Sequence, residues 1–172
     1  MIENSATLRH PAIVGGIRIV FGVIWLIDAQ FKWRPSFIQD FVSFLTGALD
    51  RQPALIRAWI ELWIDVVNVN PVAFAYFVAL SETALAFALV LGLFSNLAYI
   101  GGAFLAFVIW STAEGFGGPY GAGSTDIGAA VIYILVFALL WQTRAGLYLG
   151  LDRRLGERFR SLAFLASGRV TS

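Results

Sequence analysis

The sequence predicts an all-α integral membrane protein, a four-transmembrane-helix bundle with amphipathic interfacial helices between its first and second spans. The chain has 172 residues, of which 59% are hydrophobic and only 13% charged, whereas about a quarter of the residues in a soluble domain are charged. The apolar residues gather into long blocks, and four blocks approach the length of about 20 residues that crosses a hydrocarbon core. At this length we expect one membrane domain, residues 1–172.

The four predicted spans are residues 11–31, 72–94, 97–113 and 127–142. The first is long and carries Arg18 and Asp28, so we expect a retained helix rather than a cleaved signal sequence. The sequence GLFSN predicts a tight turn between the second and third spans. The Gly-rich segment GFGGPYGAGSTD predicts a loop before the fourth, with a backbone free to approach a ligand or a neighbouring chain closely.

Residues 36–49 and 53–69 are predicted to form two amphipathic helices, because their apolar residues recur at helical spacing. Each segment is too short and too charged to span a membrane, and Pro53 is well placed to open the second. Trp59 and Trp63 lie on one face of that helix. The segments either lie in the membrane interface with aromatic anchors or form a lid over a site.

Basic residues predict the orientation of the chain. The tail, residues 144–172, contains six arginines, whereas the Gly115–Thr125 loop contains no Lys or Arg. Cytoplasmic flanks carry the excess of basic residues, so we expect a multi-pass protein with both termini in the cytoplasm. Four basic residues between 32 and 57 argue weakly against this orientation, and four nearby acidic residues offset them.

The composition excludes several kinds of chemistry. The chain has no cysteine, one histidine and one methionine, so alone it cannot form disulfides, iron–sulfur clusters, haem sites or a tetrahedral metal site. Electrons in any redox reaction must therefore pass through a diffusible cofactor or a partner subunit. The net charge of +1 gives no reason to expect a nucleic acid, and motifs of phosphate loops, hydrolases and metalloproteases are absent.

Glu82 lies near the middle of the second predicted span. A carboxylate at that depth costs several kcal/mol, so it is expected to face the bundle interior together with a partner. The candidate partners on other helices are Arg18, Asp28, Lys32, Glu114 and Asp126. An Arg18–Glu82 ion pair that only clamps two helices is one interpretation, and a functional polar site is the other.

Further polar and aromatic residues are expected at the outer end of the bundle, namely Trp25, Asp28, Lys32, Trp110, Glu114, Asp126 and Tyr133. Asp28 precedes Lys32 by four residues, so the two can pair on one helix face. Asp126 suits either catalysis or a cap on the fourth span. The mixture of aromatic and charged side chains is suited to an amphiphilic ring such as a quinone head group. The belts of aromatic residues that membrane proteins carry at the membrane interface have a similar composition.

Four stretches resemble the DoxX/DoxD family: RIVFGVIWLIDAQFKW, ETALAFALVLGLFSNLA, GGPYGAGSTDIGAAVIY and, later in the chain, GLYLGLDRRLG. The order of these stretches, together with the long amphipathic insert between the first two predicted spans, is most similar to the DoxD type of this family. The resemblance implies a four-helix bundle in a bacterial or archaeal cytoplasmic membrane. It also implies a role in a quinone-linked oxidoreductase, as in the large subunit of thiosulfate:quinone oxidoreductase. The positions that correspond to the family pattern are Arg18, Lys32, Glu82 and Asp126.

The leading hypothesis is a membrane subunit of a quinone-linked oxidoreductase that oxidises a small sulfur compound such as thiosulfate. Glu82, Asp28 and Asp126 would be the catalytic, proton-relaying acids; Arg18, Trp25, Lys32, Trp110, Glu114 and Tyr133 would bind the substrate or a diffusible quinone. One alternative is a non-catalytic anchor or assembly subunit of a redox or secreted complex. Another is a small proton-coupled transporter. The expected partners are the lipid bilayer and a partner subunit or second copy.

Overall fold

The computed structural model describes residues 3–121, 124, 126–154 and 165–167, and within them every regular element is a helix. The long helices are α1 (Glu3–Lys32), α4 (Ala54–Asn68), α5 (Pro71–Leu91), α6 (Ser95–Ser111) and α7 (Ala129–Gln142). The short ones are α2 (Pro35–Gln39), α3 (Phe41–Thr46) and the 3-10 turns η1 (Gly47–Leu49), η2 (Gly115–Gly117) and η3 (Ala145–Leu147). The predicted all-α class is confirmed.

Two described helical segments, Pro11–Lys32 and Pro71–Leu91, are long and apolar enough to cross a membrane by length and composition. Helices α6 and α7 are also apolar, but they contain 17 and 14 residues. At 1.5 Å per residue they are about 26 and 21 Å long, shorter than a hydrocarbon core of about 30 Å. Length and composition thus identify two candidate spans in the described residues, whereas the sequence predicts four.

The ends of α5 follow from its flanking residues. Pro71 is its first residue, and the Asn70 side chain accepts a hydrogen bond from the Ala73 amide at 3.1 Å, as an N-cap does. Gly92 ends the helix with a φ of +60°, a left-handed conformation that glycine adopts easily. The predicted span continued to residue 94, but the helix stops at Leu91 because Gly92 turns the chain into α6.

The insert between α1 and α5 agrees only partly with its prediction. Helix α4 lies one residue inside each predicted end of the 53–69 segment. The expected helix over 36–49 is instead divided into α2, α3 and η1, with Asp40 at the first break. Aspartate competes for backbone hydrogen bonds and is weak in a helix interior. Within this insert, buried Gln52 donates hydrogen bonds to the Gly115 and Gly118 carbonyls, which ties the insert to the α6–α7 connection.

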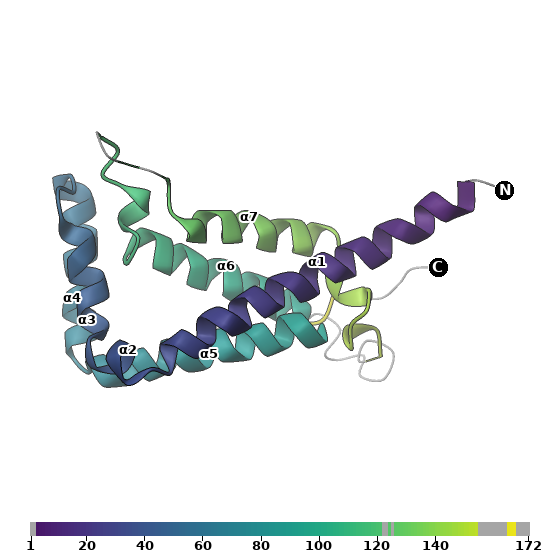
Figure 1. Cartoon of the computed structure of the whole chain (residues 1–172), viewed down its shortest axis with the longest axis horizontal. Helices are drawn as coiled ribbons and strands as arrows, with labels where there is room; N and C mark the ends of the chain where they lie inside the picture. The colour runs from purple at the N-terminus through teal and green to yellow at the C-terminus, as the bar shows by residue number, and fades with distance from the viewer. Residues whose placement is uncertain (1–2, 122–123, 125, 155–164, 168–172) are drawn as a thin grey trace.

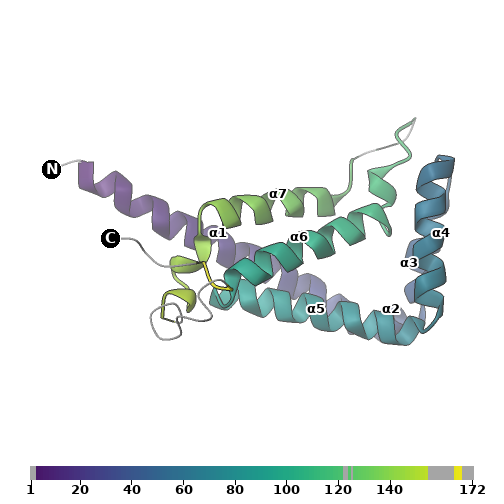
Figure 2. The same cartoon turned by 180° about the vertical axis from the view of Figure 1, so that it is seen from behind.

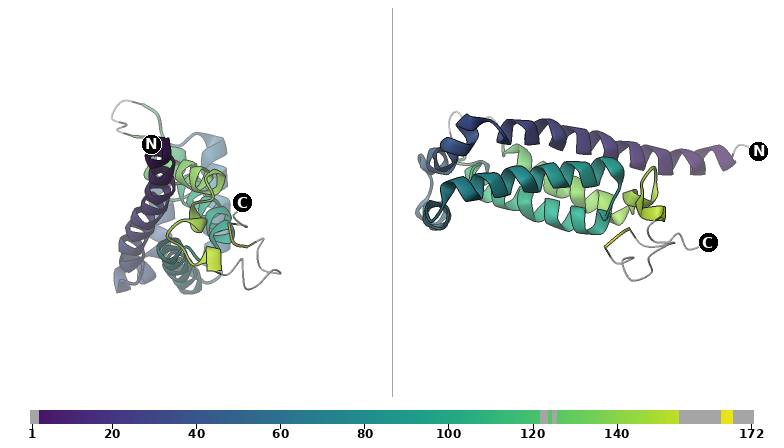
Figure 3. Two further views of the ribbon diagram at one scale, coloured as in Figure 1. Left: turned by 90° about the vertical axis from the view of Figure 1, so that its right-hand side faces the viewer. Right: turned by 90° about the horizontal axis from the view of Figure 1, so that it is seen from below.

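The long helices form two pairs, with α1 along α5 and α6 along α7 (Figure 1). Glycines permit both contacts, since a Cβ on Gly22 would lie 2.8 Å from the Val90 amide nitrogen and one on Gly102 would strike the Phe137 ring. Helices α5 and α6 meet at their connecting turn and diverge toward α4, which lies across the wide end (Figure 2). The start of α1 extends past the other helices (Figure 3).

Each of the four bundle helices presents large apolar side chains outward. The exposed ones include Ile13, Ile17, Val20, Ile24 and Ile27 on α1, Val72, Tyr76, Leu80 and Phe87 on α5, Leu97, Ile100, Phe104 and Phe107 on α6, and Ile132, Leu135 and Leu139 on α7. Monomeric soluble proteins rarely expose continuous apolar surface on this scale. The outer surface of the bundle is therefore suited to contact with lipid.

Candidate functional site

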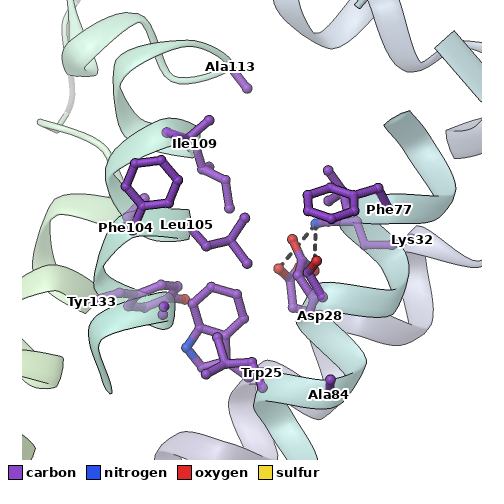
Figure 4. A pocket seen from close by; sticks show the side chains of 18 of the residues that line it. Trp25, Asp28, Lys32, Phe77, Ala84, Phe104, Leu105, Ile109, Ala113 and Tyr133 are labelled. Carbon is purple, nitrogen blue, oxygen red and sulfur yellow. Dashed lines mark hydrogen bonds and ion pairs between the residues drawn. The ribbon is translucent and has the colours of Figure 1, made fainter. Parts of the chain in front are cut away.

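A cavity of about 1070 Å³ lies between the two helix pairs. Figure 4 shows Asp28 and Lys32 on one wall, with Phe104, Leu105 and Ile109 of α6 opposite. Most of its lining is apolar, and its charged lining residues among the described part of the chain are Asp28, Lys32, Arg34, Glu82 and Glu114. An apolar cavity with a few convergent polar groups is the usual form of a small-molecule site.

The charged wall consists of one ammonium group facing two carboxylates. Lys32 Nζ donates a hydrogen bond to Asp28 Oδ2 at 3.1 Å and lies 3.7 Å from Glu82 Oε2. Asp28 and Lys32 are one turn apart in α1, and Glu82 reaches them from the middle of α5. At 3.7 Å the second contact is an ion pair without a hydrogen bond. The three groups therefore carry one more potential negative charge than positive charge.

The Glu82 side chain is fully buried, and neither of its oxygens has a hydrogen-bond partner among the described residues. A buried polar atom without a partner is costly, so such atoms are normally satisfied by water or a ligand. The indole nitrogen of Trp25, which is 1% exposed, is also without a described partner. Both residues line the cavity, so the polar atoms without a described partner lie close to its wall.

Aromatic side chains close the cavity between α1 and α7. The Trp25 ring lies 5.6 Å from the Tyr133 ring and 5.9 Å from the Phe137 ring, measured between centroids. Phe21 adds an edge-to-face contact with Phe137 at 5.0 Å. These distances are typical of packed aromatic pairs, so the faces of Trp25 and Tyr133 that line the cavity are held by a rigid support.

The structure brings six of the predicted site residues to this one cavity: Trp25, Asp28, Lys32, Glu82, Glu114 and Tyr133. Glu114 also has a structural contact, because its carboxylate accepts a hydrogen bond from the Ala130 amide at 3.1 Å. A carboxylate at the first turn of a helix accepts hydrogen bonds from backbone amides that have no partner within the helix, and it interacts favourably with the positive end of the helix dipole. The cap on α7 that the sequence suggested for Asp126 is thus supplied at Ala130 by Glu114.

Two predicted residues, Trp110 near the end of α6 and Asp126 in the loop before α7, do not line the main cavity. The Trp110 indole donates to the Ile127 carbonyl at 2.8 Å, and Asp126 Oδ1 accepts from the Gly128 amide at 2.8 Å. Asp126 instead lines a separate, more polar hollow of about 650 Å³. These hydrogen bonds shape the loop, and Asp126 is not grouped with Glu82.

Arg18 lies at the opposite end of the bundle and is fully buried. Its guanidinium donates to the carbonyls of Leu89, Val90, Tyr148 and Leu149, the last three at 3.2, 3.1 and 2.9 Å. The carbonyls belong to the end of α5 and the segment after η3. The Arg18–Glu82 ion pair that the sequence left open is therefore not formed, and Arg18 joins the C-terminal segment to the α1–α5 pair.

Sequence reasoning missed a second buried polar cluster at that end. Asp152 is fully buried, and its Oδ2 atom accepts hydrogen bonds from the Ser95 amide at 3.0 Å and the Ser167 amide at 3.1 Å. The first of these bonds caps the start of α6. Tyr99, also buried, lies in α6 one turn beyond Ser95. The one sequence signal is that Asp152 directly follows the apolar segment GLYLGL before the arginines.

No group of three or more His, Cys, Asp or Glu side chains that could hold a metal ion occurs in the described part of the chain. In comparisons with protein-family models, curated proteins and solved structures, nothing matched this chain.

Proposed function

We propose that this chain is a membrane subunit of a quinone-linked oxidoreductase and that it binds a quinone in the cavity between the two helix pairs. One observation carries the proposal: Glu82 is buried at the wall of a largely apolar cavity, with neither carboxylate oxygen hydrogen-bonded by a described residue. A quinone is a flat amphiphilic ring whose oxygens need hydrogen bonds inside a protein. Glu82, Lys32 and the Trp25 indole offer such contacts, and Tyr133 offers a ring face.

The proposal includes four helices across the bilayer, with both termini on the cytoplasmic side. The outward apolar side chains of α1, α5, α6 and α7 support it. Helices α6 and α7 are shorter than an average hydrocarbon core, and a short span is accommodated by local thinning of the bilayer at modest cost. Helix α4, which lies across the wide end of the bundle (Figure 1), would rest at the outer interface.

A bound quinone would supply two-electron, two-proton redox chemistry. The residues of this chain would hold its head group and exchange its protons. The Lys32 ammonium would stabilise negative charge that develops on a ring oxygen, and the Glu82 carboxyl group would accept a proton as the carboxylate or donate one as the acid. The Asp28 side chain is 42% exposed, so Asp28 would continue the path of proton exchange from buried Glu82 toward the surface. The proposed electron donor, a small sulfur compound such as thiosulfate, rests on the resemblance to DoxD proteins.

The direct test is quinone extraction and mass analysis of protein purified in its native lipid, comparing the wild type with Glu82→Gln. Glu61→Gln is a matched control, because Glu61 is an exposed acid of α4 that pairs with Arg57. The proposal predicts stoichiometric quinone in the wild type and the control, and its loss from Glu82→Gln. Wild-type protein free of quinone that also fails to bind added quinone would contradict the proposal.

A second candidate, a non-catalytic anchor for a redox or secreted partner, is favoured by the outer face of α4. Leu55, Leu62 and Val66 are 84%, 55% and 41% exposed, and their spacing places them on one face of α4; Val69, directly after the helix, is 84% exposed. An unpaired apolar stripe of this kind suits a protein or an interface. Stable co-purification of a partner with both wild type and Glu82→Gln, without quinone in either, would favour this role.

A further inference from the structure

The cavity has a long opening between α5 and α6. The lining residues Phe77, Phe87 and Leu91 of α5 are 65%, 52% and 44% exposed, and Leu97 and Phe104 of α6 are 55% and 65% exposed. These residues run along two helices that diverge from their common turn (Figure 2). Apart from Ser81 of α5, the lining residues along this opening are apolar, so the opening faces the same surroundings as the outer surface of the bundle.

The other sides of the cavity are covered by packed or hydrogen-bonded groups. The contacts of Trp25 with Tyr133 and Phe137 close the α1–α7 side. The Arg18 hydrogen bonds and the α5–α6 turn close the narrow end. The buried cluster of Ile38, Phe41, Leu45, Val67 and Ala75 packs the insert against α5 at the wide end. At this end the exposed lining residues include the polar residues Arg34 and Ser36, whereas the exposed lining residues between α5 and α6 are apolar.

We infer that the α5–α6 opening is a lateral entrance through which a ligand dissolved in the bilayer reaches the Lys32–Glu82 wall, and that the opening holds the ligand's apolar tail. The inference rests on the proposed function and specifies its substrate class, a quinone with a long hydrocarbon tail. From Glu82 to Leu91 the apolar groove extends for about 14 Å at 1.5 Å per residue. The cavity volume of about 1070 Å³ exceeds what one ring fills.

Small residues keep this entrance wide. Ala84 of α5 and Gly101 of α6 both line the cavity and are exposed. A Cβ added at Gly101 would meet no atom within 4 Å, so a larger side chain there projects into open space without displacing the fold. Gly16 of α1 is equally open, but it does not line the cavity. A leucine at Gly101 would therefore narrow the entrance. A leucine at Gly16 is the matched control, because it adds the same side chain away from the cavity.

The test measures quinone association with protein reconstituted in lipid nanodiscs, followed by quenching of tryptophan fluorescence. Two probes are compared, a decaprenyl benzoquinone and the same ring without a tail. In Gly101→Leu and Ala84→Leu we expect the tailed quinone to associate about tenfold more slowly, while the tailless ring, which is smaller and leaves the opening empty once it is bound, is slowed less. Gly16→Leu should match the wild type for both probes. An unchanged thermal midpoint would show that each variant is folded.

The outcomes separate this inference from the proposed function. Equal association rates of the tailed quinone in wild type, Gly101→Leu and Ala84→Leu would overturn the lateral entrance, while saturable binding of both probes would leave the head-group site standing. Equal slowing of both probes would also overturn the assignment of the tail to this opening. Failure of the wild type to bind either probe would overturn the proposed function itself, and the entrance with it.

Discussion

Lys32 of α1 and Glu82 of α5 form an ion pair across the first helix pair, with 3.7 Å between Nζ and Oε2. Glu82 is fully buried, whereas the Lys32 side chain is 19% exposed. Charge interactions are much stronger in such surroundings than in water. When one partner of a buried ion pair is replaced, the other charge stays buried without compensation. This lowers the free energy of unfolding more than replacement of both partners does.

The first prediction is therefore a non-additive double-mutant cycle. Lys32→Met alone should lower the free energy of unfolding by about 3 kcal/mol, and Glu82→Gln in the same chain should restore part of this loss. We expect a coupling energy of about 1–3 kcal/mol from denaturant titration in mixed micelles. Because Lys32 also contacts Asp28, Asp28→Asn serves as the comparison. Strictly additive effects of Lys32→Met and Glu82→Gln would show that the two groups do not interact.

Adjacent glycines of α6 should respond in opposite ways to alanine. A Cβ at Gly102 would strike the Phe137 ring, whereas one at Gly101 meets nothing within 4 Å. Gly102→Ala should destabilise the protein by about 1–3 kcal/mol, and Gly101→Ala should be neutral or stabilising by up to about 1 kcal/mol. Thermal unfolding in the same detergent measures both. Similar midpoints for the two variants would contradict the α6–α7 packing.

Arg18 is expected to stabilise the C-terminal segment rather than bind the ligand. Arg18→Met removes the donors for four carbonyl groups, and each buried group left unpaired costs about 1–3 kcal/mol. We predict faster hydrogen exchange at the amides of Leu147 and Tyr148, which are bonded within η3 and its end. Since Arg18 does not line the main cavity, quinone affinity of the folded variant should equal the wild-type value. A loss of affinity without faster exchange would place Arg18 in the binding site.

Replacement of Asp152 by asparagine should destabilise the protein less than replacement by alanine. Its Oδ2 atom accepts hydrogen bonds from two amides, those of Ser95 and Ser167. Asn keeps one acceptor oxygen of the same shape, whereas Ala leaves both amides unpaired, at about 1–3 kcal/mol each. The thermal midpoint should thus fall in the order wild type, Asp152→Asn, Asp152→Ala. Equal midpoints for the two variants would mean that these hydrogen bonds do not stabilise the fold.

Local signals explain why most helices could be predicted. Pro71 and Gly92 bound α5, and the spacing of apolar residues predicted α4 to within one residue at each end. The contact of Asp28 with Lys32 follows from their four-residue spacing on one helix. These features depend on residues that are close in the sequence. The same reasoning overestimated the helix over 36–49, because one aspartate breaks it.

Long-range contacts explain what could not be predicted. Arg18 bonds to carbonyls that are 71 to 131 residues away, and backbone carbonyls carry no residue-specific signal. Asp152 precedes two arginines, as a solvated residue of a basic tail would, yet it is buried beneath α6. The separation of Asp126 from Glu82 depends on the path of the Gly-rich loop, which spacing alone does not determine.

The most direct measurement is photoaffinity labelling in native membranes with a quinone that carries a diazirine on its ring, followed by peptide mass mapping. The proposed site predicts labels on cavity-lining residues near Glu82, such as Trp25, Leu105 and Tyr133. Excess unlabelled quinone should abolish these labels, and Glu82→Gln should reduce them. Labels confined to the outer surface of the bundle, or unaffected by unlabelled quinone, would contradict the proposal that the cavity binds the head group.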